Sequence, residues 1–376
     1  MKIGIICYPS HGGSGVVATE LGMELAKRGH VVHFISYQQP FRLDRFQQNV
    51  FYHEVEMLAY PVFKYPPYTL ALINTIAELV EREGLEILHA HYAIPHSFCA
   101  LVAREILGAR KLRVVTTLHG TDITLVGNDP SFKRITCYCI EKSDGVTAVS
   151  ESLRSDTYDT FGVSRRVATI YNFINTRRVF RLPGTREVVG CPAGKCRVLA
   201  HVSNFRPVKR IPDVIQIFAR VRSRMQAKLL LVGDGVQRRE AQELADRLQL
   251  TEDIVFMGTQ DNVVPILSAA DLFLLPSEKE SFGLGALEAM ACKVPVIATR
   301  TGGIPEVVVH GETGYLAPIG DVESMARYAI ELLSSEEKLR QMGEAARRRV
   351  EEYFDSEIIV PQYEAFYEEV LRQPRQ

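Results

Sequence analysis

Two glutamates with seven residues between them, Glu280 and Glu288, form the most specific chemical pattern in the chain. Glu288 falls in an apolar stretch, where a buried carboxylate needs a partner. At 100° per residue the two side chains would lie about 80° apart around a helix and could bracket one ligand. The amides of Ser281, Phe282 and Gly283 would lie at the start of that helix and attract a phosphate. An acid that only complements the helix dipole would explain Glu280 but not Glu288.

Three cations, Arg206, Lys209 and Arg210, follow a predicted strand at 197–203 and precede a predicted helix. This arrangement suits a pyrophosphate, whose charge must be held while it leaves. A solvated basic loop is the alternative. The sequence contains no Asp-x-Asp pair, which enzymes that hold a sugar diphosphate through a metal commonly use. We therefore expect Lys209 and a helix N-terminus to hold the phosphates, with no metal and no cofactor.

A glycine-rich loop follows the first predicted strand, and Gly13, Ser14 and Gly15 begin a G-x-G-x-x-A pattern typical of dinucleotide-binding folds. That fingerprint also needs an acid at the end of the second strand to bind the ribose. Here the second strand ends at Ser36 and Tyr37, with no acid. A dehydrogenase is therefore disfavoured, and the loop is expected to bring backbone amides to another anion. A glycine turn needed only for strand–helix packing is the alternative.

Histidines cluster at the ends of two further predicted strands. His119 follows strand 113–118, and a neutral imidazole there could donate a hydrogen bond to a substrate hydroxyl or carboxylate. The alternative is a polar turn in which Asp122 caps the next element. His89, His91 and His96 surround Tyr92, but no carboxylate accompanies them, so a metal site is not predicted here.

Alternating apolar runs and helical patterns must position these residues, and they predict an α/β fold. The chain is expected to form two Rossmann-like, doubly wound parallel sheets facing across a cleft, followed by C-terminal helices. We place an N-terminal Rossmann-like domain at 1–175, a C-terminal Rossmann-like domain at 176–352, and a helix packing back on the first domain at 353–376. The predicted strands are 2–7, 31–36, 87–90, 113–118 and 145–149, and then 197–203, 227–232, 254–257, 272–275 and 294–298.

Composition excludes several classes of protein. The chain has 376 residues with a net charge of -1, which gives no reason to expect nucleic acid or an anionic membrane as partner. No secretory leader or membrane span is recognisable, so a cytoplasmic location is expected. Self-association is left open. Seven cysteines are an odd number for a disulfide framework, and Cys191 and Cys196 lack two further ligands for a metal. All the thiols are expected to be reduced.

With these residues the chain resembles the large retaining GT-B glycosyltransferase family that carries E-x7-E in its second domain, and the resemblance runs from end to end. It includes the segments 302–306 and 311–314. Other segments resemble members that transfer N-acetylglucosamine from UDP-GlcNAc to L-malate, the first step of bacillithiol biosynthesis. They are CYPSHGGSGVVATELG, YPPY, HAHYAIPH, TTLHGTDIT, YNFIN, SNFRPVKR and EKESFG.

The resemblance implies a role for each residue. Glu288 would bind the ribose of UDP, Glu280 the hydroxyls of the transferred sugar, and Lys209 the diphosphate. Transfer with retention would proceed on one face of the sugar, and the leaving phosphate would help to deprotonate the malate hydroxyl without an enzyme nucleophile. The implied catalytic residues are His119, Lys209 and Glu280. The implied donor site comprises Gly13, Asn204, Arg206, Lys209, Arg210, Glu280, Ser281, Phe282, Gly283 and Glu288.

For the acceptor, the resemblance implies Ser14, Tyr92, Thr117, His119 and Asn172, with the Gly13 amide as a further candidate. Many relatives carry Arg where this chain has Asn204, so either Arg206 or Arg210 would supply the second charge at the diphosphate. Three alternatives stay open: an inositol phosphate acceptor, a lipid-linked sugar acceptor, and a non-catalytic sensor of nucleotide sugars. The substrates expected as partners are UDP-GlcNAc and L-malate.

Overall fold

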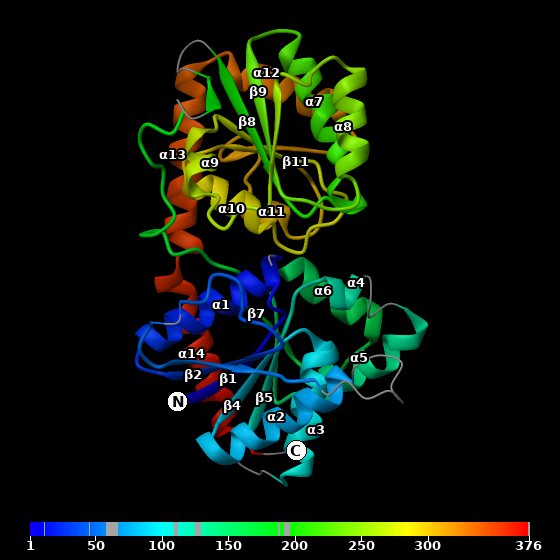
Figure 1. The fold of residues 1–376 in the computed structure, drawn as a ribbon, viewed down its shortest axis with the longest axis vertical. Coiled ribbons are helices and arrows are strands. Elements are labelled where there is room, and N and C mark those ends of the chain that lie inside the picture. Colours follow the sequence, from blue (N-terminus) through cyan, green and yellow to red (C-terminus); the bar gives the residue numbers. More distant parts are fainter. Residues whose placement is uncertain are drawn as a thin grey trace. The chain divides into compact units, whose positions relative to one another are not determined.

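The computed structural model describes residues 1–10, 12–44, 46–57, 67–108, 112–124, 129–186, 189–191 and 196–374. The chain forms two compact units, and each contains a parallel sheet with helices on both faces (Figure 1). Unit 1 comprises Met1–Asn172 and Ile359–Gln376, and unit 2 comprises Phe173–Ile358. The chain thus leaves unit 1 once and returns to it with its last helix. Within the described ranges, no helix has the length and apolar character needed to cross a membrane.

The sheet of unit 1 has seven parallel strands in the order β3-β2-β1-β4-β5-β6-β7. Its central strands are buried along their whole length, as expected for a sheet with helices on both faces. The strands are β1 (Lys2–Ile6), β2 (Val31–Ser36), β3 (Val50–Glu54), β4 (Ile87–His91), β5 (Arg113–Leu118), β6 (Gly145–Ala148) and β7 (Val167–Thr169).

The helices of unit 1 begin and end at recognisable residues. Asp129 accepts a hydrogen bond from the Ser131 amide at one N-terminus, and Ser150 caps another. The helices are α1 (Gly13–Lys27), α2 (Tyr68–Glu83), α3 (Phe98–Ile106), α4 (Thr121–Thr124), α5 (Pro130–Lys142) and α6 (Glu151–Phe161), with a π-helical turn at Ala93–Ser97.

The C-terminal helix α14 (Ser356–Arg372) belongs to unit 1 from Ile359 on (Figure 1). It buries Tyr363 and Tyr367 completely, and the Tyr367 hydroxyl forms a 2.7 Å hydrogen bond with Nδ1 of His89 in β4. At Gly145 a Cβ would lie 2.8 Å from the Phe366 ring, so the first residue of β6 must be small where this helix crosses it. The last helix is therefore part of the core of unit 1.

The sheet of unit 2 has six parallel strands in the order β10-β9-β8-β11-β12-β13. The strands are β8 (Arg197–Val202), β9 (Ala227–Val232), β10 (Ile254–Gly258), β11 (Leu272–Leu275), β12 (Val296–Thr299) and β13 (Gly314–Ala317). The helices are α7 (Ile211–Arg222), α8 (Arg238–Arg247), α9 (Val264–Ala269), α10 (Leu284–Ala291), α11 (Ile304–Val307), α12 (Val322–Leu333) and α13 (Glu336–Tyr353). A 3₁₀ turn spans Pro207–Lys209.

The predicted α/β fold with two Rossmann-like sheets is confirmed, and every predicted strand is present within two residues of its predicted bounds. The sequence analysis missed β3, β7 and β13. Strand β3 lies at the sheet edge and is half-exposed, so it lacks a continuous apolar run. Strand β7 has only three residues, and β13 begins with a glycine that packs directly against the Val296 backbone.

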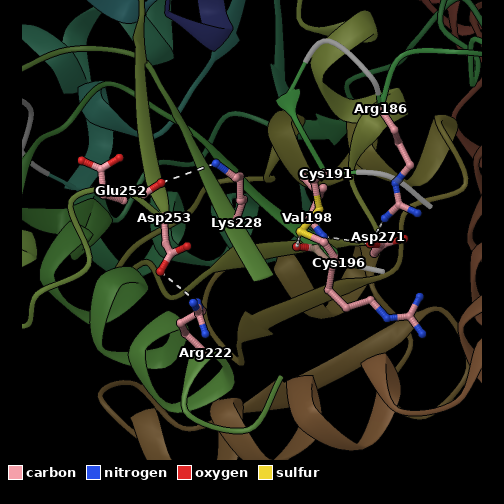
Figure 2. The surroundings of a disulfide bond; sticks show 10 residues. Arg186, Cys191, Cys196, Val198, Arg222, Lys228, Glu252, Asp253 and Asp271 are labelled. Atoms are coloured by element: carbon pink, nitrogen blue, oxygen red, sulfur yellow. Dashed lines mark hydrogen bonds and ion pairs between the residues drawn. A yellow bond between two sulfur atoms is a disulfide. The ribbon is translucent and has the colours of Figure 1, made fainter. Parts of the chain in front are cut away.

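The expectation that all thiols are reduced is wrong for one pair. Cys191 and Cys196 form a disulfide with a Cα–Cα distance of 5.3 Å, within the usual range (Figure 2). The spacing of Cys191 and Cys196 was considered only as a possible metal site. A separation of five residues is also compatible with a disulfide between them. Cys191 is fully buried next to the start of β8. The other five cysteines are free.

This pairing predicts a definite count of reactive thiols. Denatured without reductant, the protein should expose five thiols to a colorimetric thiol reagent, and seven after reduction. The double variant Cys191→Ser, Cys196→Ser is the control and should give five under both conditions. Seven thiols in the unreduced wild-type protein would contradict the disulfide.

Candidate functional site

The predicted donor residues of unit 2 follow two neighbouring strands, β8 and β11. The strand order reverses between these two strands, because β9 lies on one side of β8 and β11 on the other. At such a point the connections leave in opposite directions, which opens a crevice at the strand carboxyl ends. The segment after β11 contacts the segment after β8, since the Glu278 amide donates a 2.8 Å hydrogen bond to the Val208 carbonyl.

Lys209 and Glu280 meet in this crevice. The Lys209 ammonium lies 2.5 Å from Oε1 of Glu280, and the Ser277 hydroxyl donates to the same oxygen at 3.0 Å. The two charged side chains keep only 20% and 11% of their surface exposed. A partly desolvated, hydrogen-bonded pair holds each side chain in one direction. The structure therefore brings together two of the three predicted catalytic residues.

A glycine pair after β12 holds the backbone of Glu280. The Gly303 amide donates a 3.0 Å hydrogen bond to the Glu280 carbonyl. Gly302 has a φ of +51°, and a Cβ on it would lie 1.9 Å from the same carbonyl oxygen. Only glycine allows this approach. Gly302 and Gly303 were noted as part of the family resemblance, but their contact with Glu280 was not predicted.

Helix α10 begins at Leu284, and Gly283 precedes it with a φ of +96°. Phe282 is buried and packs edge-on against Phe354, with ring centroids 5.6 Å apart. Glu288 lies in the second turn and is 7% exposed. Because Glu280 precedes the helix, the 80° angle predicted between the two carboxylates does not apply. Their relation is set by the loop from Glu280 to Gly283 and by its glycine anchors.

Arg206 and Arg210 are the two candidates for the second charge at the diphosphate, and they differ in their surroundings. Arg210 has a left-handed backbone, and its Nε donates to Asp213 at 2.7 Å. The exposed guanidinium of Arg206 forms no hydrogen bond or ion pair with any residue that the structure describes. Asn204 is also exposed. Arg206 is therefore the side chain free to turn toward an anion.

In unit 1 three predicted acceptor residues, Ser14, Tyr92 and His119, follow β1, β4 and β5, around the reversal of strand order between β1 and β4. Gly13 and Ser14 begin helix α1, and the Tyr92 hydroxyl donates a 2.9 Å hydrogen bond to the Ser14 hydroxyl. A Cβ on Gly15 would lie 2.6 Å from the Ser10 carbonyl, so this loop needs a glycine there. Tyr92 directly follows β4 with a φ of +93°.

His119 joins this group from the end of β5. Its Nε2 lies 2.8 Å from Nδ1 of His91, and its ring centroid lies 5.3 Å from that of Tyr92. The structure therefore brings Ser14, Tyr92 and His119 together, as the sequence analysis expected of one site. His91 also takes part, and the alternation of His89 and His91 along one strand was the signal for it.

Asp122 positions the loops after β4 and β5. Its carboxylate accepts hydrogen bonds from the amides of Ala93, His119 and Gly120 at 2.9 to 3.2 Å. The alternative interpretation, a polar turn held by Asp122, is thus observed, although Asp122 lies within helix α4 and accepts from the amides of His119 and Gly120 that precede it. The role of His119 stays a prediction. Burial raises the pKa of Asp122 to about 6, and these amide hydrogen bonds oppose the rise.

Two weaker acceptor candidates have different surroundings. The Thr117 hydroxyl is fully buried and engaged by Nε2 of His89 and the Thr147 hydroxyl, each at 2.7 Å. Asn172 is 6% exposed, and its Oδ1 has no hydrogen-bond partner among the described residues. Asn172 thus keeps an acceptor available for a ligand, whereas the Thr117 hydroxyl is used in the core.

Burial keeps four histidines around β4 and β5 neutral. It lowers the pKa of His89 and His119 to about 3 and that of His96 to about 4, and His91 shifts the same way. Neutral His119 can therefore donate one hydrogen bond and accept another. In the described part of the chain, no group of three or more histidines, cysteines or acids is arranged to hold a metal ion.

Two family models match the chain in succession. The model described as Glycosyltransferase Family 4 matches residues 11–178, and the model described as Glycosyl transferases group 1 matches residues 170–349. Among curated proteins, the chain is 52% identical to N-acetyl-alpha-D-glucosaminyl L-malate synthase of Bacillus anthracis. That alignment covers 99% of this chain and 98% of the relative.

Solved structures share the fold over nearly the whole chain. Sucrose-phosphate synthase from Thermosynechococcus elongatus aligns with a TM-score of 0.82 at 22% identity, covering 98% of this chain and 99% of that one. Anabaena Alr3699/HepE, solved with UDP and glucose, aligns with a TM-score of 0.81 at 20% identity, covering 97% and 98%. Both likenesses show the arrangement of two Rossmann-like sheets.

The neutral histidines predict that unit 1 loses stability in acid. Between about pH 6.5 and 4 the unfolded chain binds protons at His89, His91, His96 and His119 that the folded unit excludes. The free energy of unfolding should therefore fall as pH falls, by up to about 1.4 kcal/mol per pH unit for each histidine. Asp122 acts in the opposite direction with one proton, so the histidines dominate.

The measurement is urea unfolding at several pH values, with hydrogen exchange in β4 and β5 reporting on unit 1. His96→Asn keeps a donor for the His91 carbonyl but removes one titrating group. The slope of stability against pH should then be shallower by about one proton, or about 1.4 kcal/mol per pH unit. An unchanged slope would show that His96 is not held neutral by the fold.

Proposed function

This chain belongs to the group 1 glycosyltransferases, and from that premise we propose that it transfers N-acetylglucosamine from UDP-GlcNAc to the hydroxyl of L-malate. The products are GlcNAc-malate and UDP, and the reaction is the first step of bacillithiol biosynthesis. The observation that carries the proposal is the 52% identity, over nearly the whole of both chains, to a protein named as an L-malate synthase of this kind.

Unit 2 binds the donor in this proposal. Glu288 accepts hydrogen bonds from the ribose, and Glu280 from the sugar hydroxyls. The Lys209 ammonium has three protons, so it can keep its contact with Glu280 while another proton points to the diphosphate. Arg206 supplies the second charge, because Arg210 is already paired with Asp213.

The chemistry needs no group of the enzyme to form a covalent bond. The bond between the anomeric carbon and the diphosphate oxygen breaks while a bond to the malate hydroxyl oxygen forms on the same face. The hydroxyl proton passes to the leaving phosphate oxygen. Negative charge grows on the diphosphate during this step, and fixed cations and helix amides stabilise that charge more in the transition state than before it.

Unit 1 binds the acceptor through neutral donors. Ser14, Tyr92 and His119 are in mutual contact, and the Gly13 amide lies at the start of α1. These groups suit a small dicarboxylate, since hydrogen bonds to ionised oxygens are stronger than those between neutral groups. Asn172 offers its unpaired oxygen to the malate hydroxyl. Thr117 supports the site indirectly by holding His89.

The reaction itself provides the first test. Purified protein incubated with UDP-GlcNAc should release UDP only when L-malate is present, and added chelator should leave the rate unchanged. Release with inositol phosphate or a lipid-linked sugar, but not with malate, would replace the acceptor in this proposal. Tight UDP-GlcNAc binding without turnover of any acceptor would identify a sensor instead.

Variants separate the two halves of the site. Glu288→Gln should weaken UDP binding about tenfold, the effect of losing one good hydrogen bond to a ligand. Ser14→Ala should raise the KM for malate by a similar factor and leave UDP binding unchanged. Equal effects of both variants on both ligands, measured by calorimetry and steady-state kinetics, would contradict this division.

The leaving group provides a further test. Lys209→Ala should lower kcat about 10²-fold or more, because a fixed charge at the developing anion is lost. Arg206→Ala should lower kcat more than Arg210→Ala, which disrupts only an existing ion pair. The reverse order would show that Arg210 leaves Asp213 to contact the diphosphate.

A further inference from the structure

Unit 2 contains a cavity that none of the predicted donor residues line. Its volume is about 840 Å³, and it lies between the segment 180–186 and helix α13. Five of its lining side chains are cationic and two are acidic: Arg181, Arg186, Lys293, Arg347 and Arg348, with Glu344 and Glu351. The lining side chains therefore have three positive charges in excess, and Asp271, which pairs with Arg186, offsets one of them.

Both acids of the cavity are already paired. Glu344 binds Lys293 at 2.9 Å, and Glu351 binds Nε of Arg347 at 2.6 Å. The remaining cations of the lining are Arg181, Arg186 and Arg348. Exposed Arg348 forms no hydrogen bond or ion pair within the described part of the chain, so its charge is available at the cavity mouth.

Two less exposed arginines of the lining, Arg181 and Arg186, lie near one carboxylate, and only Arg186 forms an ion pair with it. Nη2 of Arg186 donates to Asp271, which also accepts from the Val198 amide and is 6% exposed (Figure 2). Arg181 donates to the Ala270 carbonyl at 3.1 Å, and burial lowers its pKa although Asp271 opposes this. The Nε of Arg186 is buried and has no partner among the described residues. A buried cation without a full set of acceptors is unfavourable.

We propose that this cavity binds a small organic polyanion, with its charged groups on Arg181, Arg186 and Arg348. The volume falls in the range of small-molecule sites. Planar guanidinium groups match the geometry of carboxylate oxygens and of phosphate oxygens. The shared chemistry of the ligand is therefore an anion with several such oxygens. A bound anion accepts from the unpaired Nε of Arg186 and balances the excess charge.

The cavity also includes the C-terminal end of the helix that carries Glu288. Arg347, on the cavity wall, donates to the carbonyls of Ala291, Val179 and Thr176 at 2.7 to 3.0 Å. Ala291 is the last residue of α10 and lines the cavity. Gly283 precedes the same helix at its other end, and none of the predicted donor residues lines the cavity.

The test is calorimetric titration of the full-length protein in the presence of saturating UDP, with tripolyphosphate in one series and citrate in the other. One further site per chain is expected for at least one probe. Arg348→Glu should weaken it at least tenfold. Arg340→Glu, the same charge change on an exposed residue of α13 outside the cavity, should leave it unchanged.

Stronger binding of tripolyphosphate would identify a phosphate ester as the ligand class, and stronger binding of citrate a polycarboxylate. No binding of either probe would overturn the proposal, as would equal weakening by Arg340→Glu, which indicates nonspecific attraction. The site does not depend on the proposed transferase activity. If UDP fails to bind, the comparison of the Arg348 and Arg340 variants still decides whether the cavity is a site.

Discussion

Each sheet is parallel, and its strand order reverses beside its first strand. This constraint positions every candidate residue, because connections that leave in opposite directions open a crevice at the strand carboxyl ends. In unit 1 the reversal lies between β1 and β4, where Ser14 and Tyr92 follow the two strands and bind each other. In unit 2 it lies between β8 and β11, where Lys209 and Glu280 do the same. Both candidate sites therefore lie at the same place in the fold, where the strand order reverses, and they differ in their side chains.

In each unit the loops around the crevice are held by contacts to backbone groups. The Asp122 carboxylate accepts from amides after β4 and after β5, and so fixes the direction of His119. In unit 2 it is the backbone of the acidic residue that is held: Gly302 and Gly303 contact the Glu280 carbonyl. The Glu280 carboxylate instead pairs with Lys209. Loops would otherwise be the most mobile parts of the chain. These contacts keep reactive side chains in place without ligand.

The sequence predicted those features that depend on local pattern. Buried strands such as β9 and β11 contain continuous apolar runs, and Glu288 attracts notice because it interrupts an apolar stretch. Features that depend on residues far apart in the chain were not predictable in this way. The contact of Gly302 with Glu280 joins two separate loops, and the Tyr367–His89 contact joins residues 278 positions apart.

The electrostatics of the two units fit opposite tasks. In the proposed reaction, unit 2 has to stabilise charge that develops on a leaving diphosphate, and it presents the cationic side chains of Lys209 and Arg206. Unit 1 presents hydroxyls and imidazoles that burial keeps neutral. A neutral site discriminates between ligands by hydrogen-bond geometry. A ligand that leaves a buried donor of the site unpaired is disfavoured by the full cost of desolvating that donor. A bound carboxylate beside His119 would also raise the pKa of that imidazole. In the proposed reaction, acceptor binding in unit 1 would therefore be coupled to the state of His119 and, through its contacts with His91 and Asp122, to the loops around it.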